Sequence, residues 1–431
     1  MSPTSPGHAP ARRLAACARA LMMSAALLAA TPALAQSPTP PALPLDDALR
    51  RSLTADPSRA GVQARLEASK AGVSQANVRP NPSLGLEVEN FTGSGPFSAL
   101  GRTEATLSYQ QTYERGGKRQ ARTALAEREI GLVEARAQVR RLDLAKTVQL
   151  AWIEVLSAQA EIDVARERLS VTQRAEREVS RRVAGARDPL FAGARADAEV
   201  AQAQVSLDRA QTNARDARAA LAAYWGGTPE FTIPGDVFED TRSPEGSVAA
   251  ETPDVKLLAV EQDVAAARIA LEQTRAVQDP IVSLGVRHLQ EDGAVALVVG
   301  ASIPLGRYDT NHGAIDRARA ERAAIAADLG AFQIEREREI ARLIARRAAA
   351  AAEVRKTDVD VLPNAERAVA LVRDGYSRGG FSYLDVLAAQ RAVIDAKTRR
   401  VEILKAFHQD GAALDRLTGA HAMLARTELQ P

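Results

Sequence analysis

Residues that could carry catalysis or bind a metal are few and scattered in this sequence. Outside residues 1–35, the histidines His288, His312, His408 and His421 have no partner four residues away and no acidic cluster beside them. Protein metal sites need several such ligands close together. The single cysteine, Cys17, leaves no thiol chemistry or disulfide for the rest of the chain. No Ser-His-Asp, HExxH or dinucleotide-binding motif occurs in a workable context. We therefore predict that the protein is not an enzyme and holds no metal or other cofactor.

Three short polar motifs are explained more simply by turns and helix starts. The stretch Arg115–Arg119 is glycine-rich and basic like a phosphate loop but lacks the P-loop spacing. We predict a strand-to-helix turn there, with basic side chains near lipid headgroups as the alternative. Asp188-Pro189 fits an N-cap followed by a proline at the first helical position. Ser382-x-x-Asp385 fits a capping box, in which a hydroxyl and a carboxylate satisfy backbone N–H groups at a helix start.

Composition and charge favour long helices and argue against a nucleic-acid partner. Apolar residues make up 46% of the 431 residues but aromatic residues only 4%, and alanine and arginine dominate. Such a composition suits long helices that pack closely. Lysine and arginine number 56 against 54 acidic residues, a net charge of +2. A nucleic-acid binder would need a larger basic surplus.

Residues 1–35 are predicted to be a secretory signal peptide. Arg12 and Arg13 precede an apolar, alanine-rich run, and an Ala-Leu-Ala sequence predicts cleavage after Ala35. Cys17 ends a lipoprotein-like box, but no apolar segment precedes the box, so lipidation is not expected. No later stretch approaches about 18 uninterrupted apolar residues. If the exported protein crosses a membrane, it must therefore do so as strands.

The strongest internal signal is a tandem duplication. The stretch Pro80–Leu86 matches Pro280–Val286 at an offset of 200 residues, and Gly185–Leu190 matches Gly379–Leu384 at an offset of 194. We therefore predict two repeats with flanking segments: linker 36–44, first repeat 45–225, equatorial linker 226–252, second repeat 253–418 and C-terminal tail 419–431.

Each repeat is predicted to hold a helix, two short strands, a long helix, a turn and a returning helix. The strand segments alternate apolar and polar residues, and the long segments carry apolar residues in the three-and-four spacing of coiled coils. The predicted elements are helix 45–78, β-hairpin 83–111, long helix 118–184 and helix 190–225, then β-hairpin 281–303, long helix 314–374 with a kink at Pro363, and helix 384–418. The predicted fold class is mainly α with a small β part.

The number of strands bears on the oligomeric state. Strands of about nine residues with one apolar face suit a tilted crossing of a bilayer. A sheet in a membrane must close, because hydrocarbon offers nothing to an unpaired edge. Two chains would give eight strands, a barrel filled by its own side chains. Three chains would give twelve strands, so a homotrimer is the smallest assembly expected to enclose water.

Three motifs then resemble those of a known family. They are Arg79-Pro-Asn-Pro-Ser-Leu, Gln111-Thr-Tyr-Glu-Arg-Gly-Gly-Lys-Arg119 and Tyr376-Ser-Arg-Gly-Gly-Phe-Ser-Tyr-Leu-Asp385. With the duplication, the chain resembles the TolC family of trimeric outer-membrane efflux ducts over essentially the whole mature sequence. The first two motifs resemble its CzcC-like branch, which serves cobalt-zinc-cadmium exporters. The resemblance implies a twelve-stranded trimeric outer-membrane β-barrel, a long coiled-coil α-barrel in the periplasm, and two partners, a periplasmic adaptor (membrane fusion protein) and an inner-membrane RND transporter.

The resemblance also implies site residues at the two helical turns. Asp385 matches a periplasmic gate carboxylate, with the capping box as the alternative role, and Phe191 is taken as its equivalent in the first repeat. Tyr376 matches a tyrosine of contacts that hold the gate shut, with simple packing as the alternative. Phe381 stands where an arginine is usual and Ala388 where a second acid is usual, so a simpler polar network is expected. Adaptor contacts are expected at Gly185, Arg187, Arg378, Gly379, Gly380 and Phe381.

Three alternative functions stay open at this point. The same duct fold could serve multidrug efflux or type I secretion of a polypeptide. A periplasmic coiled-coil adaptor would share the long helices but not the two strand pairs or the end-to-end duplication. An enzyme of the cell envelope would need a catalytic constellation, and the sequence offers none.

Overall fold

A computed structural model describes residues 41–98, 100–242 and 251–426 of the chain. The predicted signal peptide with Cys17 and its cleavage site lies outside the described residues, as do most of linker 36–44 and parts of the equatorial linker and the tail. Residues from Ala42 onward form one unit. Within the described part of the chain, no helix combines the length and the apolar character that a membrane crossing requires.

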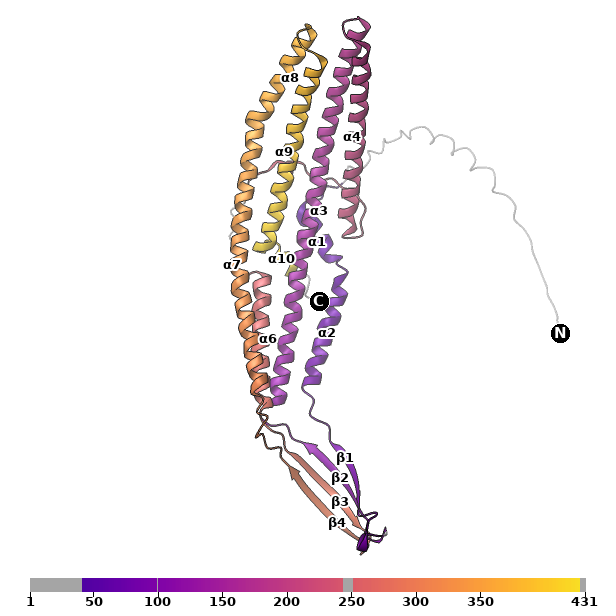
Figure 1. Cartoon of the computed structure of the whole chain (residues 1–431), viewed down its shortest axis with the longest axis vertical. Coiled ribbons are helices and arrows are strands. Elements are labelled where there is room, and N and C mark those ends of the chain that lie inside the picture. The colour runs from indigo at the N-terminus through magenta and orange to yellow at the C-terminus, as the bar shows by residue number, and fades with distance from the viewer. Residues whose placement is uncertain (1–40, 99, 243–250, 427–431) are drawn as a thin grey trace, which may run out of the picture. The chain divides into compact units, whose positions relative to one another are not determined.

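Helices and strands follow one another in two similar series (Figure 1). The first series is α1 (Leu45–Thr54), α2 (Ser58–Ala76), β1 (Ser83–Glu89), β2 (Glu104–Thr112), α3 (Lys118–Ala184) and α4 (Leu190–Ala223). The second is α6 (Pro253–Arg275), β3 (Ile281–Leu289), β4 (Ala294–Ser302), α7 (His312–Lys356), a π-helical turn (Thr357–Val361), α8 (Leu362–Ser377) and α9 (Tyr383–Thr418). The short helix α5 (Asp236–Glu239) follows the first series, and the short helix α10 (Ala422–Arg426) follows the second. Two 3-10 turns, Gly95–Phe97 and Leu100–Arg102, lie between β1 and β2. The repeat boundaries themselves remain a proposal.

The helices depart from the sequence-based expectation at two prolines. The prediction of one helix over 45–78 is wrong, because α1 ends at Thr54 and α2 begins only after Pro57. Proline cannot continue a helix, and the Asp56 carboxylate accepts a hydrogen bond from the Ser58 N–H at 2.8 Å. The interruption expected at Pro363 takes the form of the π-helical turn just before it.

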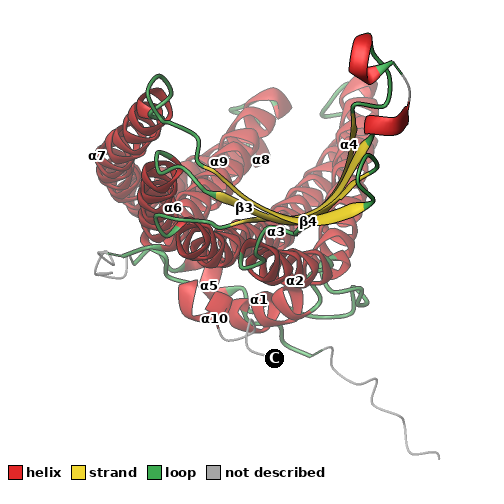
Figure 2. Ribbon diagram, turned by 90° about the horizontal axis from the view of Figure 1, so that it is seen from below, coloured by secondary structure: helices red, strands yellow, loops and turns green. Residues whose placement is uncertain are grey.

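The four strands form one antiparallel sheet in the order β1-β2-β3-β4. Its register places Leu86, Leu107, Val286 and Leu297 side by side in one row across the sheet. All four of these apolar side chains are exposed. Figure 2 shows the sheet curved across its width. The strand order makes β1 and β4 its two edges. The sheet therefore has a bare apolar face and two unpaired edges, and a membrane protein cannot leave such edges in hydrocarbon.

The basic stretch Arg115–Arg119 forms the turn between β2 and α3, as predicted. Gly117 precedes α3 in the left-handed conformation, with a φ of 78°. The Asp279 carboxylate closes the turn, accepting from the Arg115 N–H at 2.8 Å and from the Lys118 ammonium at 2.6 Å. Two donors of this stretch are thus satisfied by a carboxylate of the chain itself, which supports a structural role for the turn.

The long helices pack as two hairpins, α3 with α4 and α8 with α9, and α3 also contacts α9. Alanines make up much of the first seam, where Ala158 of α3 packs with Ala210 and Ala214 of α4, and Ile162 belongs to the same cluster. Such small residues let two helices approach closely. Within the unit that begins at Ala42, the sheet lies beyond one end of the helices and the two hairpin turns lie at the opposite end (Figure 1).

Candidate functional site

The turns that join the paired helices share one backbone design. In each turn a backbone N–H donates to the carbonyl oxygen five residues earlier, Arg187 to Arg182 and Gly380 to Gly375, both at 2.8 Å. This is the Schellman closure, which needs one residue in the left-handed conformation. Glycine supplies it in the α8–α9 turn, whereas the α3–α4 turn uses Ala186 with a φ of 50°.

The geometry corrects the alignment of the two repeats at this point. The N-cap residues, Pro189 before α4 and Ser382 before α9, lie 193 residues apart. The offset of 194 inferred from the sequence is therefore one residue too long here. The equivalent of Asp385 in the first repeat is Ala192, and the prediction of Phe191 is wrong, because the left-handed turn residue that corresponds to Gly379 is Ala186 and not Gly185.

A charged cluster joins the two turns. The Arg182 guanidinium of α3 binds the Asp188 carboxylate through two hydrogen bonds, Nε to Oδ2 at 3.0 Å and Nη2 to Oδ1 at 3.1 Å. The Tyr376 hydroxyl of α8 donates a short hydrogen bond to the same carboxylate. Arg182 also donates from Nη1 to the Tyr376 carbonyl at 2.8 Å, and its guanidinium lies 4.3 Å from the Tyr376 ring centroid. These three residues, here called the tip cluster, connect one helical hairpin to the other.

Burial makes the tip cluster stronger than a surface ion pair. The Arg182 and Asp188 side chains are 12% and 13% exposed, and Tyr376 is 4% exposed. The Arg182 hydrogen bonds lower the pKa of Asp188, while burial and the Asp188 hydrogen bond raise the pKa of Tyr376 well above its usual value. Asp188 therefore stays ionised and Tyr376 stays neutral across the physiological pH range.

An apolar core lies directly beneath the tip cluster. It contains Val179 of α3, Ala196 of α4, and Val386 and Leu387 of α9, all buried. Tyr376 belongs to the same core, where its ring centroid lies 6.4 Å from that of Tyr383. Removing the tip cluster would therefore leave an apolar contact that still holds the hairpins together in part.

The role predicted for Asp188 as an N-cap is wrong. The N-cap of α4 is Pro189, which makes no side-chain capping hydrogen bond. The Asp188 carboxylate turns instead to Arg182 and Tyr376, because a buried guanidinium and hydroxyl offer stronger partners than a solvated helix end. Sequence reasoning missed Arg182 entirely. Its only local signal is its position six residues before an aspartate, across a turn.

The capping role predicted for Asp385 is present. The Asp385 carboxylate accepts hydrogen bonds from the Ser382 N–H at 2.8 Å and the Ser382 hydroxyl at 2.7 Å. The Asp385 N–H donates to the Ser382 hydroxyl oxygen at 3.3 Å, which completes the capping box. These hydrogen bonds lower the pKa of Asp385. The side chain is exposed, so its charge also faces solvent.

The residues expected to meet an adaptor all lie exposed on the two turns. They are Gly185, Arg187, Arg378, Gly379, Gly380 and Phe381. Apolar side chains that the sequence reasoning left out are exposed beside them. Leu190 and Phe191 begin α4, and Leu384 begins α9. Exposed apolar residues next to basic ones are typical of a protein-binding surface.

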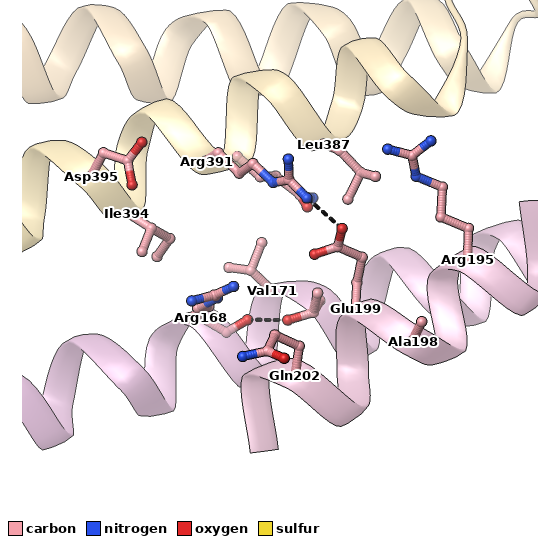
Figure 3. Close-up of a pocket in the computed structure, with 12 residues that line it drawn as sticks. Arg168, Val171, Arg195, Ala198, Glu199, Gln202, Leu387, Arg391, Ile394 and Asp395 are labelled. Carbon is pink, nitrogen blue, oxygen red and sulfur yellow. Dashed lines mark hydrogen bonds and ion pairs between the residues drawn. The ribbon is translucent and has the colours of Figure 1, made fainter. Parts of the chain in front are cut away.

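Further ion pairs connect the hairpins farther from the turns. A groove of about 320 Å³ lies between α3, α4 and α9. Figure 3 shows Arg391 of α9 pairing with Glu199 of α4 in this groove. Lys397 of α9 pairs with Glu167 of α3 at 2.6 Å. Opening the helical end by moving α8 and α9 would have to break these contacts as well as the tip cluster.

Two of the histidines, His408 and His421, have structural surroundings. His408 contacts the Phe238 carbonyl through Nε2 at 2.9 Å, and burial lowers its pKa. His421 Nε2 lies 3.3 Å from the Gln149 side-chain oxygen. Among the described residues, no three histidine, cysteine or acidic side chains gather in a way that could hold a metal ion.

Comparisons with known sequences agree with this architecture. The chain matches the family described as "Outer membrane efflux protein" over residues 48–227 and 247–420. It is 30% identical to the cobalt-zinc-cadmium resistance protein CzcC of Cupriavidus metallidurans, over 82% of this chain and 84% of that protein. It is 27% identical to the nickel-cobalt-cadmium resistance protein NccC of Alcaligenes xylosoxydans xylosoxydans, over 72% and 71% of the two chains.

Solved structures share the fold. The outer membrane protein VceC of Vibrio cholerae superposes with a TM-score of 0.65 at 22% identity, over 87% of this chain and 96% of that chain. The CusC channel superposes with a TM-score of 0.69 at 15% identity, over 87% and 91% of the two chains. The family resemblance inferred from the motifs is thus confirmed, and this chain belongs to the outer membrane efflux protein family.

Proposed function

We propose that this chain is the outer-membrane duct of a tripartite RND-type efflux system that exports heavy-metal cations. The observation that carries the proposal is a four-stranded sheet with a bare apolar face and two free edges, joined to long paired helices in a chain of this family. The names of CzcC and NccC support divalent metal ions as the cargo. The family assignment speaks against the alternative of a periplasmic adaptor.

The proposed assembly is a homotrimer. Three four-stranded sheets would close a twelve-stranded barrel in outer-membrane lipid, wide enough for water. The helical hairpins of the three chains would continue that lumen into the periplasm. The exposed turn residues would meet a periplasmic adaptor, which would link the duct to an inner-membrane transporter. The duct itself would catalyse no reaction, and its passage of ions would be controlled at the turns.

The cargo is tested by growth of a deletion strain. We expect loss of this protein to lower tolerance to zinc, cadmium, cobalt or nickel and to leave tolerance to hydrophobic drugs unchanged. Expression of the intact chain from a plasmid should restore metal tolerance. Lost drug tolerance with normal metal tolerance would instead favour the same duct serving multidrug efflux. A secretion defect with both tolerances intact would favour type I secretion.

The proposed gate role of Asp385 is tested separately from its capping role. Three copies around a threefold axis would place like charges close together, attract cations and resist passage when the helices close. We expect Asp385→Ala to raise the conductance in planar bilayers and to weaken block by multivalent cations. Ser382→Ala is the matched control, because it removes the capping hydroxyl at a cost of about 1 kcal/mol and keeps the carboxylate. Equal currents and equal block in Asp385→Ala and the wild type would rule out the gate role.

A further inference from the structure

The two free sheet edges raise the question of how β4 of one chain meets β1 of the next. Within a chain, β2 is the second strand of its hairpin and pairs with β3, the first strand of the following hairpin. A closed trimer would contain six similar hairpins. In it, β4 of one chain is the second strand of its hairpin, and β1 of the neighbouring chain is the first strand of the following hairpin, so the two strands are related as β2 and β3 are. The β2–β3 pairing is therefore a template for the junction between chains.

The template gives a specific register. The hairpins pair alike, since Ser83 lies opposite Gln110 in the first and Ser283 lies opposite Gly300 in the second. Gly300 is thus the counterpart of Gln110, and Ser83 the counterpart of Ser283. Because Gln110 lies opposite Ser283 at the internal junction, we infer that Gly300 of one chain lies directly opposite Ser83 of the next. This inference rests on the trimeric assembly proposed above.

The inferred register keeps the two faces of the sheet consistent across the junction. It places Val299 beside Leu84, Leu297 beside Leu86 and Val295 beside Val88, all of them exposed apolar side chains. A shift by one residue would turn every apolar side chain of one strand toward the other face, so only shifts by two compete.

In the inferred register, no two like charges lie directly opposite each other across the junction. On the opposite face, Ala296 lies across from Glu87 and Ala294 across from Glu89, so no like charges meet. All seven residues of β1 find a partner in β4, from Ser83 to Glu89. If the register shifted by two residues so that Val298 lay opposite Ser83, two residues of β1, including Glu89, would have no partner in β4.

The hydrogen-bond pattern makes the pair at Ser83 suitable for a disulfide. At the internal junction the Tyr113 N–H donates to the Pro280 carbonyl at 2.9 Å, so that pair is hydrogen-bonded. Hydrogen-bonded and non-hydrogen-bonded residue pairs alternate along an antiparallel ladder. The pair Gln110 and Ser283 lies three residues from the Tyr113 and Pro280 pair, so it is non-hydrogen-bonded, with Cα atoms about 4.5 Å apart. Disulfides need a Cα separation of about 4.4–6.8 Å. Gly300 and Ser83 of neighbouring chains inherit this geometry.

Cysteine pairs test the register in the full-length protein. In a single chain, Ser83 and Gly300 sit on opposite sheet edges, about 14 Å apart across three strand spacings, so a disulfide between them must join two chains. All variants carry Cys17→Ser. We expect Ser83→Cys with Gly300→Cys to give a covalent trimer on a non-reducing gel after mild oxidation of outer membranes. The shifted pairs, Ser83→Cys with Val298→Cys or with Ser302→Cys, should cross-link at least tenfold less.

The outcomes separate the register from the assembly. The mass of the purified cysteine-free protein in detergent is measured in parallel. A trimeric mass with preferential cross-linking of a shifted pair, or with no cross-linking of the Ser83 and Gly300 pair, would overturn the register and leave the proposed duct in place. A monomeric mass without cross-links would overturn the register and the proposed trimer together. A trimeric mass with the expected cross-link supports both.

Discussion

Replacing Asp188 with asparagine is expected to open the helical end of the duct and to raise its conductance severalfold in planar bilayers. The substitution leaves the Arg182 guanidinium buried without its counter-charge and weakens the Tyr376 hydrogen bond. Breaking a fully buried ion pair by removing one partner typically costs about 3–5 kcal/mol, which is an upper bound for this part-buried pair. That cost arises three times in a trimer, so the closed arrangement loses much of its advantage.

Two matched variants show whether the ion pair itself is responsible. Tyr376→Phe removes only the hydroxyl and keeps the ring in its core, so a smaller increase is expected. Asp163→Asn removes a carboxylate from α3, the helix that carries Arg182. There the Asp163–Arg166 pair is mostly exposed. Exposed pairs contribute about 0–1 kcal/mol, so this variant should conduct like the wild type. Wild-type conductance in Asp188→Asn would show that the tip cluster does not hold the closed state.

The tip cluster should also be insensitive to pH in the physiological range. The folded protein holds the pKa of Asp188 below its ordinary value of 3.8. A depressed carboxyl pKa contributes stability that is fully present above the unfolded pKa and is lost as the pH falls through the folded pKa. Conductance should therefore show no contribution from Asp188 between pH 5 and pH 8, and opening through this group should begin only below about pH 4.

Replacing Leu86 with arginine is expected to abolish assembly in the outer membrane. Leu86 lies on the apolar face of β1 and is 72% exposed. An arginine on the lipid face of a membrane barrel costs about 2–4 kcal/mol at the bilayer centre, and the trimer would bear this cost three times. The amount of protein in outer-membrane fractions, measured by immunoblotting, should fall to near background.

The adjacent residue supplies the control for this prediction. Glu87 is also exposed but points to the opposite face of the same strand, the face proposed to line the lumen. Glu87→Arg introduces the same side chain at nearly the same depth, and we expect it to assemble normally. Equal loss of both variants, or normal assembly of Leu86→Arg, would contradict the orientation of the sheet in the membrane.

Local patterns allowed much of the fold to be predicted. The helix α3 has the predicted bounds, because no proline interrupts Lys118–Ala184 and its apolar spacing is helical throughout. The strands of the first repeat follow from a clean alternation of apolar and polar residues, and those of the second repeat show the same alternation less cleanly. The break at Pro57 was missed because the apolar pattern continues on both sides of it, although a proline after an aspartate is a sufficient reason for one helix to end and another to begin.

The tip cluster could not be predicted in the same way. Asp188 and Tyr376 are separated by 188 positions in the chain, and no local pattern connects them. Only the packing of the α3–α4 hairpin against the α8–α9 hairpin brings the carboxylate, guanidinium and hydroxyl together. Tyr376 was expected at a closing contact through family resemblance, but its partners were not, since Asp188 also fits the residue preference of a helix start.

We propose that three identical chains pool their strands and helices around one water-filled lumen. Single-particle imaging of the purified protein in lipid nanodiscs, processed without imposed symmetry, tests it most directly. The expected result is three chains around a threefold axis, with twelve strands in the lipid and a continuous lumen through strands and helices. A particle with another number of chains, or an open sheet at the bilayer, would contradict the claim.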